Sequence, residues 1–439
     1  MSTTSKPKAQ SDWQAGLSSV DITPAEPIWQ AGWGNRTQPS IGVTTRLFAK
    51  ALALKYQNDP VSILLSSDLM AYSVEFVDEV VATAKKRFGI DRARLILCAS
   101  HNHSAPVTTN VLPLYYDFNP QQMEVIKRYS DSLHDKFVDA IGRAIEELAP
   151  ATLEFGNNMA GFAINRRRSR PDGRAWANVV DQDVPVLCVR DLEGKVRGIA
   201  FGYACHTTTV NDDTINGDYA GFAQEELEKL YPGAVALFIN GCGGDQGPHP
   251  RFKTELGRTY GHILATAVDD QIKQRMCLPS TPVNGPLNAA AGSATLRFEK
   301  PPTLAEYEAM LPGRSEQYLR EVQHQIDLLK AGKPQIKEYP YSMQVWRFGS
   351  GQTFVIMSSE VVIDYQIKFK QKYGVDSTWV LAYANEHIAY IPSLRVLEEG
   401  GYEGTRGMLE CGFPSPFTKD VEQSITRTIE QLWEEAEPK

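Results

Sequence analysis

Two patterns of apolar residues alternate along most of the chain, and they predict buried strands and amphipathic helices in turn. Apolar residues three and four positions apart predict helices over 74–88, 126–148, 220–231, 361–373 and 421–433. Continuous apolar runs predict strands over 61–65, 95–98, 151–155, 184–190, 197–205, 234–239, 353–358 and 378–383. The fold class that follows is α/β, with a mixed β-sheet core flanked by helices.

Residues at both ends of the helix predicted over 74–88 support its bounds. Ser73 can cap its N-terminus and Gly89 can end it, so the strand at 61–65, the helix and the strand at 95–98 form a βαβ unit. Such a unit has parallel strands, and functional loops usually gather at their C-terminal ends. The turn over 191–195 joins two later strands as a hairpin.

Two regions are less regular. Short alternating runs around glycines indicate a β-rich opening over 13–57. Residues 278–350 combine a proline-rich entry, a strand at 291–298 and a polar helix near 314–331, which we interpret as an irregular insertion. We expect a single domain over 13–436, preceded by a disordered polar tail over 1–12.

Composition narrows the classes of function. The formal net charge is -8, and the only dense basic cluster lies within 165–174, so a general nucleic-acid binder is excluded. No run of 18 apolar residues and no apolar leader is visible, so we expect no transmembrane segment and a soluble protein, cytoplasmic unless a leader was removed. The six cysteines form no C-x-x-C pair, which favours reduced structural thiols. The oligomeric state stays open.

Histidines at strand ends carry the candidate chemistry. His101 and His103 follow the strand at 95–98, and His206 follows the strand at 197–205. The chain has only eight histidines, so three at the ends of two buried strands favour a shared metal site over polar loop residues. Taken alone, the His-x-His pair is also compatible with two ordinary loop side chains.

Segments in the same order resemble the neutral/alkaline, non-lysosomal ceramidase family over nearly the whole chain. Two of them match closely: Asn385 to Tyr390 is similar to N-T-Y-x-x-Y, and Gly401 to Gly404 is similar to R-Y-E-G. The other segments that carry the resemblance are Gly16 to Thr23, Ser67 to Leu69, Ser100 to Pro106 (similar to T-H-T-H-S-G-P), Ile164 to Arg166, Cys205 to Thr207 and Asn216 to Gly221.

The resemblance implies a Zn²⁺ site at strand ends. It places the zinc ligands at His101, His206, Glu360 and Tyr390. It also implies a zinc-dependent amidohydrolase, in which a metal-bound water attacks an amide (N-acyl) bond of a small-molecule or lipid-like substrate.

The same resemblance implies roles for five further residues. His103, Arg166 and Tyr402 would contact the scissile amide and stabilise the oxyanion or move protons. Asp218 and Asp245 would orient ligands or loops through hydrogen bonds to their carboxylates.

Two departures from the family pattern leave the substrate open. The loop Gly244 to His249 lacks the hydroxyl of the family's G-D-x-[ST]-P-N, and the chain ends without the β-sandwich of full-length members. The cluster Arg166, Arg167, Arg168, Arg170 and Arg174 is compatible with a soluble, polar or anionic substrate instead of ceramide. An ester or glycosidic hydrolase, or a non-catalytic carbohydrate- or lipid-binding homologue, stays possible at this point.

Overall fold

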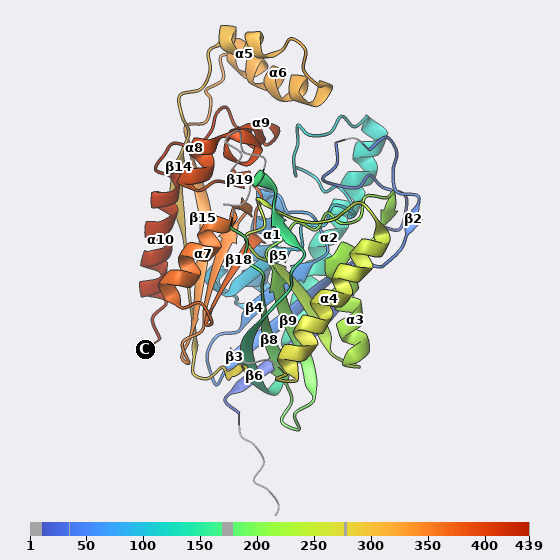
Figure 1. Cartoon of the computed structure of the whole chain (residues 1–439), viewed down its shortest axis with the longest axis vertical. Helices are drawn as coiled ribbons and strands as arrows, with labels where there is room; N and C mark the ends of the chain where they lie inside the picture. Colours follow the sequence, from blue (N-terminus) through green and yellow to red (C-terminus); the bar gives the residue numbers. More distant parts are fainter. Residues whose placement is uncertain (1–10, 35, 169–178, 276–278, 439) are drawn as a thin grey trace, which may run out of the picture.

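One mixed β-sheet runs through the computed structural model, which describes residues 11–34, 36–168, 179–275 and 279–438 (Figure 1). The sheet is 13-stranded, and the two-residue strand β13 (Thr281–Pro282) pairs with β6 beside the main path. The other strands lie in the spatial order β11 (Val235–Asn240), β9 (Val196–Tyr203), β8 (Asp183–Arg190), β6 (Ala149–Met159), β1 (Trp13–Asp21), β3 (Phe48–Tyr56), β4 (Ser62–Ser67), β5 (Leu95–Ala99), β18 (Thr378–Ala384), β16 (Thr353–Ser358), β15 (Glu338–Phe348) and β14 (Leu287–Arg297).

The sheet curves so that its two wings share one apolar interior. Strand β11 contacts β3, β4, β5 and β18, which are far from it in the strand order. A single buried cluster draws side chains from both wings, including Leu153, Leu237, Leu64, Trp346 and Trp379. Because this core links the wings, the loops at one end of the curved sheet face a common space.

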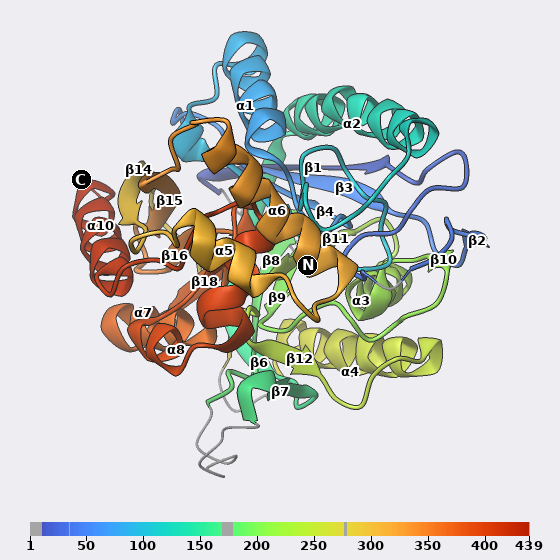
Figure 2. The ribbon, with the colours of Figure 1, turned by 90° about the horizontal axis from the view of Figure 1, so that it is seen from above.

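Helices cover the outside of the curved sheet in three groups, as the view from above shows (Figure 2). Helices α1 (Val74–Phe88) and α2 (Pro120–Glu146) form the first group, α3 (Asp218–Leu230) and α4 (Thr254–Ile272) the second, and α7 (Ile363–Tyr373) and α10 (Val421–Glu435) the third. Ser73 and Gly89 cap α1 as the sequence predicts, and β4 and β5 are parallel. Helix α4 was not predicted.

The segment 278–350 is an insertion only in its middle. Strands β14 and β15 pair over their full length and belong to the main sheet, with β16 beside them. Between them, α5 (Leu304–Met310) and α6 (Glu316–Lys330) leave the sheet and lie over one end of the molecule (Figures 1 and 2). Arg320 of α6 donates to Tyr115 O at 2.9 Å and Gln325 to Gly412 O at 2.8 Å, so this excursion bridges two loops.

Short ladders and helical turns complete the fold around the sheet. The two-stranded ladders are β2 (Gly42–Val43) with β10 (Thr214–Ile215), β7 (Ala163–Asn165) with β12 (Gln246–Pro248), and β17 (Glu360–Val361) with β19 (Tyr390–Ile391). The helical turns are η1 (Arg92–Arg94), η2 (Arg166–Arg168), α8 (Leu394–Glu399), the π-helical η3 (Tyr402–Arg406) and α9 (Gly407–Glu410).

Within the described ranges no helix combines the length and apolar character needed to cross a membrane. The expected tail over 1–12 falls almost wholly on residues 1–10, which lie outside the described part.

Helix α2 packs directly on β1 because Gly16 has no side chain. A Cβ at Gly16 would lie 1.9 Å from the backbone oxygen of Ala144 in α2, and backbone cannot move aside as a flexible side chain can. The glycine of the opening motif is therefore a packing requirement.

We expect Gly16→Ala to destabilise the protein by about 1–3 kcal/mol, the usual cost of overpacking. Guanidinium denaturation of the two proteins measures the change. Gly42→Ala is the matched control, because nothing lies within 4 Å of a Cβ there. Equal denaturation midpoints for Gly16→Ala and the parent protein would contradict this packing argument.

Candidate active site

Four expected metal ligands come together from four separate segments. His101 follows β5 and His206 follows β9, while Glu360 and Tyr390 are register partners in the parallel ladder of β17 and β19. All four residues are at most 4% exposed. His101 has a φ of 59°, which turns the chain sharply after β5 and aims its ring into the centre.

Backbone carbonyls fix the tautomers of the two histidines. His101 Nδ1 lies 3.1 Å from Met70 O, and His206 Nδ1 lies 2.6 Å from Gly243 O. A carbonyl oxygen only accepts, so each Nδ1 carries the proton and donates. Each Nε2 therefore presents a lone pair to the centre, as a metal-binding imidazole must.

Acceptor atoms face one another at this centre. Glu360 Oε2 lies 3.2 Å from His101 Nε2 and 3.1 Å from His206 Nε2. The Glu360 side chain is 4% exposed, and Oε2 has no hydrogen bond within the described residues. Burial lowers the pKa of His206 to about 4, so its ring is neutral.

These separations fit a bound cation. Ligand atoms at tetrahedral corners about 2.0–2.1 Å from zinc are about 3.3–3.4 Å apart. The Tyr390 hydroxyl lies 3.4 Å from His206 Nε2 and completes a set of two nitrogens and two oxygens. Buried lone pairs that face each other without a shared proton repel, and a cation among them removes this cost.

His103 joins the same cluster from its other side. Its Nε2 lies 3.1 Å from His101 Nε2, and one ring nitrogen of each of His101, His103 and His206 falls within 4.8 Å of the others. Gly32 leaves room for this ring, since a Cβ there would lie 2.1 Å from His103 Nδ1. Burial lowers the pKa of His103 well below its ordinary value, which keeps the ring neutral.

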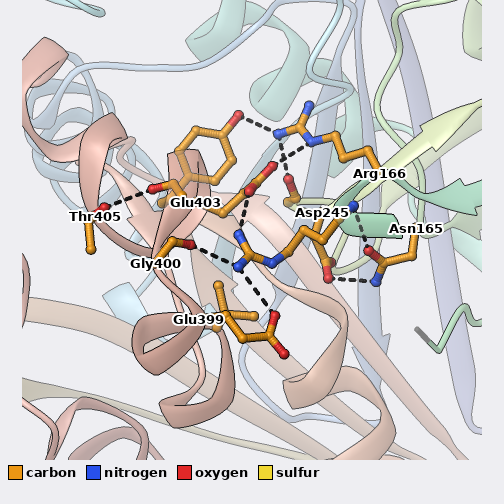
Figure 3. A network of polar contacts seen from close by, with 12 residues as sticks. Asn165, Arg166, Asp245, Glu399, Gly400, Glu403 and Thr405 are labelled. Carbon is orange, nitrogen blue, oxygen red and sulfur yellow. Dashed lines mark hydrogen bonds and ion pairs between the residues drawn. The ribbon is translucent and has the colours of Figure 1, made fainter. Parts of the chain in front are cut away.

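Arg166 is held at the edge of the site by a carboxylate (Figure 3). Its Nε donates to Glu403 Oε1 at 2.8 Å, and its Nη2 donates to Gly244 O at 2.7 Å and to the Tyr390 hydroxyl at 2.9 Å. The guanidinium thus touches a candidate metal ligand directly, and its planar geometry leaves it few other orientations.

Arg167 of the basic cluster is paired with carboxylates of its own chain and is not left for an anionic substrate. Its side chain is 9% exposed, and it donates to Glu403 Oε2 at 2.7 Å, to Glu399 Oε2 at 3.3 Å and to Gly400 O at 2.8 Å. Its charge is therefore neutralised locally by carboxylates. Arg170, Arg174 and the side chain of Arg168 lie outside the described residues.

Tyr402 lies against Tyr390 and not in the ring of acceptor atoms. The two aromatic rings meet edge to face with centroids 5.1 Å apart. The Tyr402 hydroxyl donates to Glu410 Oε1 at 2.6 Å. Tyr402 is thus next to the centre, with its polar atom held by a carboxyl that the sequence did not single out.

Asp218 and Asp245 hold loops and not histidine rings. Asp218 accepts from the backbone N–H of Val210 at 2.8 Å and so ties the loop after β9 to the start of α3. Asp245 accepts from Asn165 Nδ2 at 2.8 Å and from Ile363 N at 2.9 Å, joining β7 to α7. In the described part of the chain, backbone carbonyls and not these carboxylates orient His101 and His206.

Two residues that the sequence patterns did not single out touch the centre. His387 Nε2 lies 3.2 Å from Glu360 Oε1, the oxygen that faces away from His101 and His206. Tyr383 packs its ring 4.3 Å from that of His101. His387 had a usable signal, since it is another of the eight histidines and follows β18 in the segment that leads to Tyr390.

The sequence matches one known protein family over residues 13–255. The family model described as neutral/alkaline non-lysosomal ceramidase, N-terminal, matches residues 13–255, more than half of the chain. The chain belongs to this ceramidase family. The matched range holds His101, His103, Arg166 and His206, whereas Glu360, Tyr390 and Tyr402 lie beyond it and join the site through the fold.

Similar proteins carry the same family name. The chain is 26% identical to neutral ceramidase B of Dictyostelium discoideum over 271 residues, 57% of this chain and 37% of that protein. It is 28% identical to neutral ceramidase of Drosophila melanogaster over 266 residues, 54% of this chain and 36% of that protein. The matched segments thus span little more than a third of these relatives.

A solved structure shares the fold. The neutral ceramidase from Pseudomonas aeruginosa superposes with a TM-score of 0.74 at 18% sequence identity, over 96% of this chain and 74% of that one. The mixed sheet with flanking helices is therefore the fold of this family.

We expect His101→Ala and His206→Ala each to lose the metal, because each removes one of about four ligands. Protein prepared with a chelator, then titrated with Zn²⁺ in a calorimeter, measures the affinity. His262→Ala is the matched control, since its side chain is 67% exposed on α4 and pairs with Glu226. Unchanged zinc affinity in either site variant would sink this ligand assignment.

Proposed function

We propose that the chain is a zinc-dependent hydrolase that cleaves an amide (N-acyl) bond. The observation that carries the proposal is the convergence of His101 Nε2, His206 Nε2 and Glu360 Oε2 as unprotonated acceptors in a buried centre. Membership of the ceramidase family supports the bond type. The substrate of this chain belongs to the proposal, because the relatives are matched over only part of their length.

The types of ligand atom at the centre determine which metal ion fits best. Two neutral imidazole nitrogens with carboxylate and phenol oxygens suit zinc, and His101, His206, Glu360 and Tyr390 would hold it. When bound, zinc supplies a Lewis acid and lowers the pKa of a water to about 7. His387 Nε2 lies 3.2 Å from Oε1, the other carboxylate oxygen of Glu360.

The neighbouring side chains supply what amide hydrolysis needs besides the metal. His103 is neutral, so one of its two ring nitrogens carries a lone pair that can accept a proton. Arg166 is a fixed cation that holds the Tyr390 hydroxyl and offers positive charge next to a developing oxyanion. Tyr402 adds a phenol whose ring packs against that of Tyr390.

The surroundings support an uncharged N-acyl substrate with an apolar part. Trp33 packs edge to face on His103 with centroids 5.3 Å apart, and it continues to Phe252, which is 47% exposed. These rings offer an apolar surface beside the centre for an acyl chain. On the other side, Glu403 and Glu399 compensate the positive charges of Arg166 and Arg167.

The reaction class is tested with matched substrates that share one acyl group and differ in the bond to be cleaved. We expect the zinc-loaded protein to hydrolyse the amide, and we expect a chelator to abolish the activity and added Zn²⁺ to restore it. Product analysis by mass spectrometry measures each arm.

The other outcomes of that experiment identify the alternatives. Cleavage of only the ester or of only a glycoside would replace the amide with that bond. A lack of any turnover in protein with full zinc occupancy would make this chain a binding homologue.

Substrate charge is tested with a neutral N-acyl substrate and an anionic analogue. We expect kcat/KM for both to change by less than about tenfold between 0.1 and 1 M salt, because the described arginines of the site are already paired. A strong preference for the anion that disappears at high salt would return the basic cluster to substrate binding.

A further inference from the structure

Glu410 is a buried carboxyl directly behind Tyr402. It ends α9, and its side chain is 2% exposed. Its Oε1 accepts the Tyr402 hydroxyl at 2.6 Å, while its Oε2 is buried without a hydrogen-bond partner within the described residues. An ionised carboxylate with one unbonded buried oxygen costs free energy that a protonated carboxyl avoids.

The groups that face Glu410 come from several elements. Arg406 of η3 reaches only to 3.9 Å from Oε2 and lies closer, at 3.3 Å, to Glu321 of α6. The charges of Glu360 and Glu321 oppose a charge on Glu410, and Arg406 and the Tyr402 hydroxyl favour it. The phenol groups of Tyr115 and Tyr116 stand close by. Burial outweighs the favourable contacts and raises the pKa of Glu410 to about 8.

A phenol has a single proton, and this limits what Tyr402 can do. If Glu410 is ionised, both of its carboxylate oxygens can only accept hydrogen bonds. The single hydroxyl proton of Tyr402 is then used in the hydrogen bond to Oε1. The phenol oxygen then presents only lone pairs to any other neighbour. It therefore cannot donate a hydrogen bond to an oxyanion. If Glu410 is protonated, it can donate to the phenol oxygen, and the proton of Tyr402 is released for another acceptor.

We propose that Glu410 is a positioning residue whose carboxyl proton is donated to the Tyr402 oxygen, turning the phenol proton toward the reacting oxygen of the substrate. The inference rests on the proposed amide hydrolysis and assigns a residue that no family motif in the chain contains. Tyr402 would touch the substrate, and Glu410 would act only through Tyr402.

Four forms of the zinc-loaded full chain test the proposal: the parent, Glu410→Gln, Tyr402→Phe and the double variant. The readout is kcat/KM for a neutral N-acyl substrate between pH 6 and 10. Gln has nearly the shape of Glu and donates an N–H to the phenol oxygen at every pH.

We expect the parent to lose activity relative to Glu410→Gln as the pH rises through about 8, because the carboxyl proton is lost there. The full effect is about 10²-fold, the usual loss when one oxyanion donor is removed. In the Tyr402→Phe background, Glu410→Gln should have no effect, because the residue through which it acts is gone. Parallel pH profiles for the parent and Glu410→Gln, or an equal effect of Glu410→Gln with and without Tyr402, would overturn the proposal.

A spectroscopic arm separates this inference from the proposed function. Infrared difference spectra of the resting protein should show a protonated carboxyl band that disappears above about pH 8 and is absent in Glu410→Gln. In Glu321→Gln, which removes a neighbouring charge that opposes ionisation of Glu410, the band should persist at low pH but disappear at a lower pH than in the parent. If amides are cleaved but Glu410 carries no such band, the inference fails and the function stands. If the band is present but no amide is cleaved, the function fails, and the catalytic part of the inference fails with it.

Discussion

The structure is organised around acceptor atoms that are forced together without a proton to share. Met70 O and Gly243 O take the Nδ1 protons of His101 and His206, so two Nε2 lone pairs meet the Glu360 carboxylate at 3.1–3.2 Å in a buried centre. Such a cluster is costly in an apolar interior unless a cation fills it. Much of the surrounding fold serves to deliver these atoms from strands that are distant in the sequence.

Close backbone packing brings the segments that carry these atoms together. The loop after β11 touches β17 at Gly244, where a Cβ would lie 2.9 Å from the backbone oxygen of Glu360. Gly244 N donates to Val361 O at 2.8 Å, and Gly244 O accepts from Arg166. One glycine therefore connects the strand that carries Glu360 to the arginine that contacts Tyr390. Glu403 then balances the charge of that arginine, so that the rim carries little free charge beside the metal ligands.

The sequence was most informative where the signals are local. The capped helix α1 between two buried runs identified a parallel unit, and the histidines after β5 and β9 identified the centre. Helix α4 escaped prediction because its buried face includes Gly257 and Gly261, which pack closely on Phe222 of α3 and give a weak apolar pattern. The pairing of β14 with β15 spans the whole α5–α6 excursion, so no short window of sequence could reveal it.

Partners that are remote in the sequence account for what the sequence patterns did not show at the site. Five arginines in one segment look like an anion-binding rim, yet Glu403, more than 230 residues away, pairs with two of them. His387 and Glu410 gain their meaning only from contacts with Glu360 and Tyr402. Charge balance and hydrogen-bond direction depend on which residues meet in the folded chain. The sequence alone does not show these pairings.

The position of the metal shows whether these four side chains are the ligands. Crystals of the zinc-loaded chain, measured at the zinc absorption edge, give an anomalous difference map of the site. We expect one strong peak bounded by His101 Nε2, His206 Nε2, Glu360 Oε2 and the Tyr390 hydroxyl. A zinc peak elsewhere with this centre empty, or a centre occupied only by water at full zinc loading, would contradict it.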